Sequence, residues 1–221
     1  SAVINTFKYT LWSLVLGFPL PILTAVMLNE IKRFKAFFRF TVYFPSIVPG
    51  VAAAILWSLI YHPTSGLLNS LLSIFGIDAI PWLQSQNLVI PCIIVMMTWK
   101  GFGSTAILYL ASLQGVNQEL YEAAYVDGAG RFRVIWHITV PGLLPTYFVL
   151  LLMSVANFLN NGVDQYYVFQ NAFNKKRIQV LDLYVYNLGL GSGSYSLATA
   201  ISILKSLVSL TLLFTVNGLS K

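Results

Sequence analysis

Charge is what this sequence has least of. Only 9% of its 221 residues are charged, whereas about a quarter is usual in soluble globular domains. Hydrophobic residues make up 57% of the chain, and the mean hydropathy is +0.74. This composition excludes an ordinary soluble domain and indicates a membrane protein.

Cysteine and phosphate-binding motifs are equally scarce. Cys92 is the single cysteine, which excludes a disulfide framework and a cysteine-based metal site. The chain contains no Gly-x-x-x-x-Gly-Lys-Ser/Thr, and its one Lys-Ser pair, Lys205-Ser206, lies within an apolar run. A phosphate-binding loop cannot form there, so the sequence predicts neither an ATPase nor a bound nucleotide in this chain.

The first residues do not show the basic-then-apolar pattern of a cleavable signal peptide, and the sequence opens almost directly into a membrane-length segment. About 20 mostly apolar residues are needed for a helix to cross the hydrocarbon core. Five segments qualify, and none alternates as a barrel strand does. The sequence therefore predicts an all-α fold, a single polytopic membrane bundle over 1–221 with five transmembrane helices, at 7–28, 40–61, 88–113, 143–159 and 197–216.

Basic residues indicate how these spans are oriented. Alternating topology places seven of them on one side, in the 29–39 link, the 114–142 link and at the end of the chain, against four on the other side. Since basic residues favour the cytoplasmic side, the 114–142 link is predicted to be cytoplasmic. The amino end is then outside, and we expect a further helix upstream of residue 1. The first group is Lys32, Arg33, Lys35, Arg39, Arg131, Arg133 and Lys221, and the second is Lys8, Lys175, Lys176 and Arg177.

The cytoplasmic link contains an unusually polar stretch, "EAAYVDGAGRFRVIWHITVPG", at 122–142. Asn117 is a good N-cap for a short helix, with Glu119 in its first turn. Gly128 and Gly130 then break this helix. A second short helix is expected to follow and to end where Pro141 starts the fourth span. The product is an elbow of two helical pieces held against the membrane.

The spacing in this stretch is that of a known motif. Glu122-Ala123-Ala124 is followed after three residues by Gly128, and after nine more by Ile138, with Val140-Pro141 beyond it. This order resembles the EAA motif of the permease subunits of ABC importers, although the family usually has Leu where Val140 stands. The segments "TWKGFG", "WHITVPGLLPT" and "YSLATAISILKS" extend the resemblance to carbohydrate permeases, closest to the oligosaccharide and polysaccharide branch.

This resemblance implies a function and a set of partners. The chain would be the membrane-spanning subunit of an ATP-driven importer in the bacterial cytoplasmic (inner) membrane, and would carry a carbohydrate, with an acidic one left open. Residues 117–141 would form the coupling loop that docks on an ATPase, through Glu122, Ala123, Ala124, Asp127, Gly128 and Arg131. The implied partners are a second homologous permease, two cytoplasmic ATPase subunits that bind ATP and Mg²⁺, an extracytoplasmic solute-binding protein and the lipid bilayer, with no nucleic acid and no cofactor or metal in this chain.

Two lysines lie within predicted spans, where a charge is costly and normally faces a cavity or a partner. Lys100 stands beside Trp99 and Gly101 near the middle of the third span, where an aromatic platform and a cation suit a sugar. Snorkelling or pairing with another subunit are the alternatives, and for Lys205 they are favoured. A polar stripe on the fourth span adds candidates for the substrate path at i, i+3, i+4 and i+7, namely Ser154, Asn157, Phe158 and Asn161.

Other functions stay open at this point. An ion-coupled secondary transporter or channel subunit would use Lys100 with Asp164 or Asp182, but the broken-helix repeats typical of that class are not visible. Interhelical hydrogen bonding is the more common use of such a polar stripe. An enzyme is not indicated, because His62 and His137 fall on opposite sides of the membrane in this topology.

Overall fold

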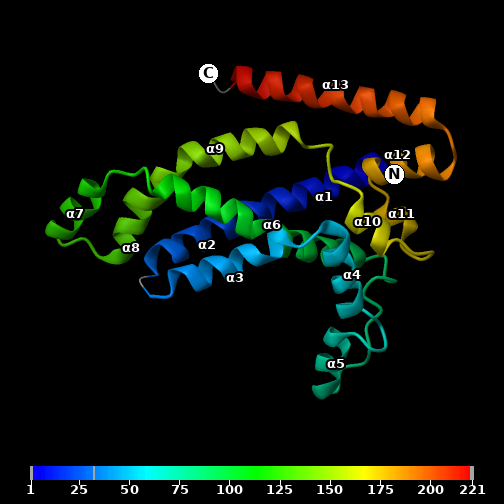
Figure 1. The fold of residues 1–221 in the computed structure, drawn as a ribbon, viewed down its shortest axis with the longest axis horizontal. Coiled ribbons are helices and arrows are strands. Elements are labelled where there is room, and N and C mark those ends of the chain that lie inside the picture. The colour runs from blue at the N-terminus through cyan, green and yellow to red at the C-terminus, as the bar shows by residue number, and fades with distance from the viewer. Residues whose placement is uncertain (1, 32, 220–221) are drawn as a thin grey trace.

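The computed structural model describes residues 2–31 and 33–219, so the predicted cytoplasmic residues Lys32 and Lys221 lie outside the described part. Long helices run roughly along the longest axis of the molecule, with α6 among them (Figure 1). The described residues contain helices and no strand, which confirms the all-α prediction. The helices of 12 residues or more are α1 (Ala2–Gly17), α2 (Pro19–Glu30), α3 (Lys35–Ile47), α6 (Val89–Leu113), α9 (Val140–Ala156) and α13 (Tyr195–Leu219).

Four helical stretches are long and apolar enough to cross a membrane: Ala2–Glu30, Val89–Leu113, Arg131–Ala156 and Tyr195–Gly218. They correspond to the first, third, fourth and fifth predicted spans. The first stretch joins α1 to α2 through Phe18, whose backbone is still helical. Pro19 and Pro21 follow in the first turn of α2, where a proline is tolerated because its missing N–H would be unpaired in any case.

The second predicted span is not one helix. Residues 40–61 divide between α3 (Lys35–Ile47) and α4 (Gly50–Ile60), whose axes differ by 97°. Val48 between them is extended, with ψ 128°, as expected for a residue that precedes a proline. α3 follows the bundle, whereas α4 turns away from it toward the short helix α5 (Leu67–Ile74) (Figure 1). Counted as one broken span, this pair brings the total to five.

The fourth helix also differs from its prediction. α8 (Arg131–Val134), a π-helical turn at Ile135–Thr139 and α9 follow one another without a break. The expectation of a separate short helix that ends at Pro141 is therefore wrong. A proline ring clashes with the carbonyl four residues earlier in an α-helix, and the wider π turn before Pro141 lets the helix continue. At its other end α9 stops at Ala156, three residues before the predicted limit.

α6 is the central element of the packing, since α1, α2, α3 and α9 all contact it. One buried cluster around Tyr9, Ile93 and Tyr166 fills the half near α10 (Asp164–Phe169), and a second around Tyr109 and Leu143 fills the other half. Where these apolar side chains would otherwise be in contact with water, their burial stabilises the packing of the helices. α13 packs on α9 and on α12 (Leu181–Tyr186) with its π-helical extension, Asn187–Gly191.

The short elements gather at the two ends of the bundle. α7 (Gln118–Val126), α8, the carboxyl end of α2 and the amino end of α3 lie at one end, at the left of Figure 1. α10, α11 (Lys175–Ile178) and α12 lie at the other end with the amino terminus. Arg131 and Arg133 therefore stand opposite Lys175, Lys176 and Arg177, as the alternating topology predicted.

Candidate functional site

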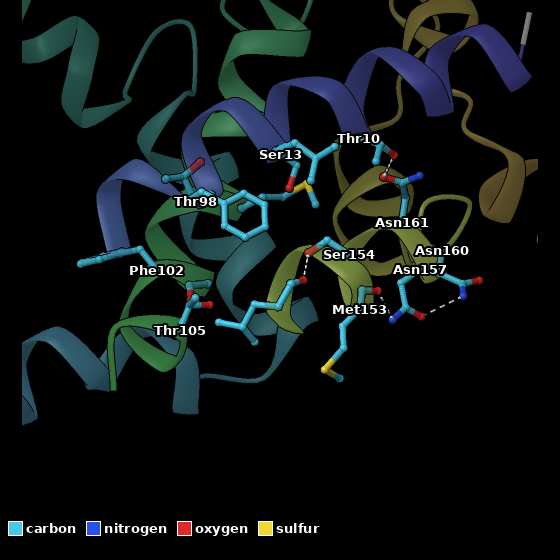
Figure 2. Close-up of a pocket in the computed structure, with 16 residues that line it drawn as sticks. Thr10, Ser13, Thr98, Phe102, Thr105, Met153, Ser154, Asn157, Asn160 and Asn161 are labelled. Atoms are coloured by element: carbon cyan, nitrogen blue, oxygen red, sulfur yellow. Dashed lines mark hydrogen bonds between the residues drawn. The ribbon is translucent and has the colours of Figure 1, made fainter. Parts of the chain in front are cut away.

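A cavity of about 360 Å³ lies between α1, α6 and α9. Figure 2 shows hydroxyl and amide side chains converging on it from all three helices. None of the described residues that line it carries a charge. Its polar lining consists of Thr10 and Ser13 from α1, Thr98 and Thr105 from α6, and Ser154, Asn157, Asn160 and Asn161 from α9 and the turn after it.

The α1 wall was not predicted from the sequence. Thr10, Ser13 and Gly17 line the cavity, and their spacing of i, i+3 and i+7 places them on one face of a helix. The Thr10 hydroxyl donates to the Phe158 carbonyl oxygen at 2.9 Å, which fixes the turn after α9 against α1. The same spacing rule that selected the polar stripe of the fourth span would have found these residues in the first.

The candidates at the end of α9 reach the cavity in a different way from the one predicted. Since the helix ends at Ala156, the single helical face proposed for 154–161 does not exist. Asn157 and Asn161 still line the cavity, because the chain turns beside it. Phe158 does not line it, and packs edge-on against Phe7 with ring centroids 5.3 Å apart.

Several of these polar groups are held in place by local hydrogen bonds. The Asn157 amide donates to the Met153 carbonyl oxygen at 3.0 Å, and the Asn160 amide donates to Asn157 Oδ1 at 3.3 Å. The Ser154 hydroxyl donates to the Leu150 carbonyl oxygen at 2.8 Å (Figure 2). These bonds leave lone pairs and one amide hydrogen on each of Asn157 and Asn160 for a ligand, since an asparagine has two donors and can accept twice.

A second cavity of about 370 Å³ lies on the other side of α6, against α3 and α10. Lys100 lines it together with Tyr43 and Ser46. Trp99 lines neither cavity and packs on Trp57, with ring centroids 5.6 Å apart. Among the described residues that line the two cavities, Lys100 alone carries a charge.

Both cavities share Met97 and Gly101 of α6. The neighbouring residues Thr98 and Phe102 face the first cavity, whereas Met96 and Lys100 face the second. Met97 and Gly101 thus form the ridge between them. A Cβ atom added at Gly101 would have no neighbour within 4 Å. The ridge between the two cavities is therefore lowest at Gly101, which has no side chain.

Met97 is held from the side of α10. Its sulfur accepts from Gln165 Nε2 at 3.7 Å and from the Tyr166 hydroxyl at 3.6 Å. Complete burial raises the pKa of Tyr166 well above its ordinary value, so the hydroxyl keeps its proton and remains a donor. α10 therefore orients the ridge between the two cavities.

Lys205 does not line either cavity. Its ammonium group pairs with Asp182 of α12, and each side chain is 14% exposed. Asp182 Oδ2 also accepts from the backbone N–H groups of Asn161, at 2.7 Å, and Gly162, at 3.0 Å. Through Asp182, Lys205 is thus connected to the turn that borders the first cavity. The pairing of Asp182 with Lys100 that a secondary transporter would use is not present, because Asp182 pairs with Lys205.

The predicted elbow is present at the opposite end of the bundle. Asn117 caps α7 by accepting from the Glu119 N–H at 3.0 Å, as expected. Gly128, with φ +75°, ends the helix, and the Ala129 N–H returns to the Ala124 carbonyl oxygen at 2.9 Å. This is a Schellman C-cap, in which the left-handed residue is normally glycine. Gly130 has φ −69° and serves as the N-cap residue of α8 instead.

Little of the elbow is covered by the rest of the chain. α7 contains no buried residue, and Val126 and Phe132 are 87% and 89% exposed. Two contacts anchor the elbow: the Tyr121 and Thr139 hydroxyls are 3.3 Å apart, and Arg131 pairs with Glu30 at the end of α2 at 3.2 Å. Glu122, Ala123 and Asp127 lie on the exposed surface.

Residues 17–219 match the family model described as "Binding-protein-dependent transport system inner membrane component". This chain belongs to that family. Two relatives in Bacillus subtilis (strain 168) align with 98% of the chain: Protein LplB, 35% identical over 69% of its own length, and the polygalacturonan/rhamnogalacturonan transport system permease protein YteP, 36% identical over 68%.

Solved structures agree with this membership. A bacterial alginate ABC transporter, in complex with alginate pentasaccharide-bound periplasmic protein, contains a chain that superposes with a TM-score of 0.94 at 33% identity. The match covers 100% of this chain and 77% of that one. The permease fold and the resemblance carried by the EAA motif are thereby confirmed, and the chain is a multi-pass membrane component of a transport system.

Proposed function

We propose that this chain is a permease subunit of an ATP-driven importer, and that it carries a carbohydrate delivered by a solute-binding protein. The observation that carries this proposal is the uncharged cavity lined by hydroxyl and amide groups from α1, α6 and α9. Sugars present many hydroxyl groups, which such a lining can match with both donors and acceptors. The names of the relatives, which refer to pectic polysaccharides and alginate, support the same class of solute.

An elongated and acidic sugar fits the two cavities better than a small neutral one. The cavities flank α6 and meet at Met97 and Gly101, so a chain of several sugar units can lie across the ridge. Lys100 supplies the one positive charge, and no carboxylate from the described residues opposes it. A charge-assisted hydrogen bond from Lys100 to a uronate carboxylate would then be stronger than one to a neutral hydroxyl.

The motor is a separate protein in this proposal. The elbow at 117–141 docks on a cytoplasmic ATPase, with Glu122 offering a carboxylate to a basic group and the exposed apolar side chains of Val126 and Phe132 packing in a cleft. Two such ATPase subunits bind ATP and Mg²⁺, a second permease completes the pathway, and the whole lies in a bacterial inner membrane. The missing phosphate-binding loop accords with this division of work.

The helix that begins in the elbow offers a mechanical route to the solute. Arg131–Ala156 is continuous, and at 1.5 Å per residue it is about 39 Å long. Its far end leads directly into Asn157 at the cavity. Closure of the ATPase pair around ATP would displace α7 and α8, and a continuous helix would transmit this displacement to the cavity wall, which alternates access between the two sides.

Reconstitution in proteoliposomes tests this function. The assembled complex, with its binding protein outside and ATP inside, should take up labelled acidic oligosaccharides and hydrolyse ATP in proportion. Asn157→Ala should raise the KM for uptake about tenfold by removing ligand hydrogen bonds, with Asn217→Ala of α13 as a control away from both cavities. Uptake driven by an ion gradient without ATP would overturn the proposal in favour of a secondary transporter.

A further inference from the structure

We propose that Asp182 is a positioning residue for solute recognition: its carboxylate holds the turn after α9 in the shape that brings Asn157, Asn160 and Asn161 to the cavity. This inference rests on the proposed function, because it concerns the wall of the same cavity. Asp182 itself lines neither cavity, so it would act through the turn and not by touching the solute.

The turn is held from both of its faces. Asn161 and Gly162 donate their backbone N–H groups to the same oxygen, Asp182 Oδ2, at 2.7 and 3.0 Å. Consecutive N–H groups that converge on one anionic oxygen form a small anion-binding concavity, and Gly162 adopts the left-handed φ of +74° that this turn requires. The Asn161 carbonyl oxygen accepts in turn from Gln165 Nε2 at 2.8 Å.

The second oxygen of Asp182 faces the fifth span, where it binds the ammonium group of Lys205. Both side chains are only 14% exposed. An ammonium and a carboxylate in such surroundings are stable only when each is paired. Lys205 therefore pairs with the oxygen of Asp182 that the turn does not use, which explains a lysine in the middle of an apolar helix without a role in binding solute.

The position of Asp182 is fixed by α1, the same helix that forms a wall of the cavity. The neighbouring Leu181 donates its N–H to Thr6 Oγ1 at 2.8 Å. Asn5 donates to the carbonyl oxygens of Lys176 and Gln179 at 2.9 and 3.0 Å, just before α12. One turn further along α1, Thr10 enters the cavity. α1 thus forms one wall of the cavity directly. Through its contacts next to Asp182, it also positions the turn after α9 that borders the cavity.

Two double variants test the proposal, because at position 182 they differ only in a side-chain amide, whose oxygen is the acceptor that the turn needs. D182N/K205M and D182L/K205M are both neutral at this pair, and Asn and Leu have similar shapes. The amide oxygen of Asn can still accept from the two N–H groups, whereas Leu cannot. In the reconstituted complex, D182N/K205M should keep the wild-type KM within about twofold, and D182L/K205M should raise KM about tenfold, with basal ATP hydrolysis unchanged in both.

A charge reversal, D182K/K205D, provides a third arm. It keeps an ion pair but places a donor opposite two backbone donors, so KM should stay raised as in D182L/K205M. A wild-type KM for D182L/K205M, or for the reversed pair, would overturn the positioning role and leave Asp182 as a partner for Lys205 only.

Amide hydrogen exchange of residues 157–163 gives a readout that does not depend on transport. The segment should exchange faster in D182L/K205M than in D182N/K205M, because only the latter keeps partners for the Asn161 and Gly162 amides. Equal protection in the two variants would overturn the inference even where uptake fails for other reasons. Failure of the wild-type complex to transport any carbohydrate would instead count against the proposed function, with the exchange result still deciding the role of Asp182.

Discussion

Two glycines of α6, only two residues apart, have opposite structural roles. A Cβ atom on Gly103 would lie 2.0 Å from the Val42 carbonyl oxygen, so α3 and α6 can touch at this point only because no side chain intervenes. A Cβ atom on Gly101 would meet nothing within 4 Å. One glycine therefore serves packing, and the other keeps the ridge between the two cavities low.

This contrast predicts different outcomes for the two positions. Gly103→Ala should destabilise the protein by about 1–3 kcal/mol through overpacking, seen as a lower melting temperature. Gly101→Leu should leave the melting temperature nearly unchanged but slow the uptake of long oligosaccharides far more than that of disaccharides. Equal uptake of all lengths by Gly101→Leu would contradict a path across this ridge.

Lys100 provides the second prediction at the residue scale. Lys100→Met keeps most of the length of the side chain but removes the single charge of the two cavities. We expect the KM for an acidic oligosaccharide to rise about tenfold, since a charge-assisted hydrogen bond is lost, while the KM for a neutral sugar of equal length changes little. A uniform loss for both sugars would assign Lys100 to the fold. Measuring uptake of matched acidic and neutral sugars separates these outcomes.

At the scale of elements, the elbow depends on how α7 ends. Gly128 has the left-handed φ of +75°, whereas Gly130 has φ −69° and also lacks neighbours within 4 Å of an added Cβ atom. Gly128→Ala should therefore cost about 1 kcal/mol in this turn, and Gly130→Ala should cost almost nothing.

The consequence is a test of coupling with a built-in control. Gly128→Ala should lower the number of solute molecules carried per ATP, because the angle between α7 and α8 is altered, and Gly130→Ala should match the wild type. Counting both uptake and ATP hydrolysis in proteoliposomes gives this ratio. An unchanged ratio in Gly128→Ala would show that the shape of this turn does not matter for coupling.

The whole molecule connects an exposed elbow at one end to an uncharged cavity, open to the surface, between α1, α6 and α9. Glu122 lies on the exposed surface of α7, and the continuous helix Arg131–Ala156 leads from the elbow toward the cavity. Glu122→Lys should abolish the stimulation of ATP hydrolysis by solute-loaded binding protein, because it reverses the charge offered to the motor. Membrane insertion and protein yield should be unaffected, since the Glu122 side chain lies on the exposed surface. Normal transport by this variant would contradict the coupling role.

Much of this architecture was fixed by the sequence through composition and local pattern. Runs of apolar residues determined the helices, because a backbone in lipid must satisfy its own hydrogen bonds. The alternation of the spans correctly placed Arg131 and Arg133 at the opposite end of the bundle from Lys175, Lys176 and Arg177. The N-cap at Asn117 and the stop at Gly128 followed from local backbone chemistry, and the EAA motif identified the family, because all of these signals lie within short stretches of chain.

The tertiary structure alone decided the rest. Neither the 97° turn at Val48 nor the π turn before Pro141 follows from the prolines themselves, since a proline only restricts its neighbourhood and packing selects the geometry. The cavity and the Asp182–Lys205 pair join residues from helices far apart in the chain. Such contacts carry no local sequence pattern, because they depend on which helix faces meet when apolar surfaces are buried together.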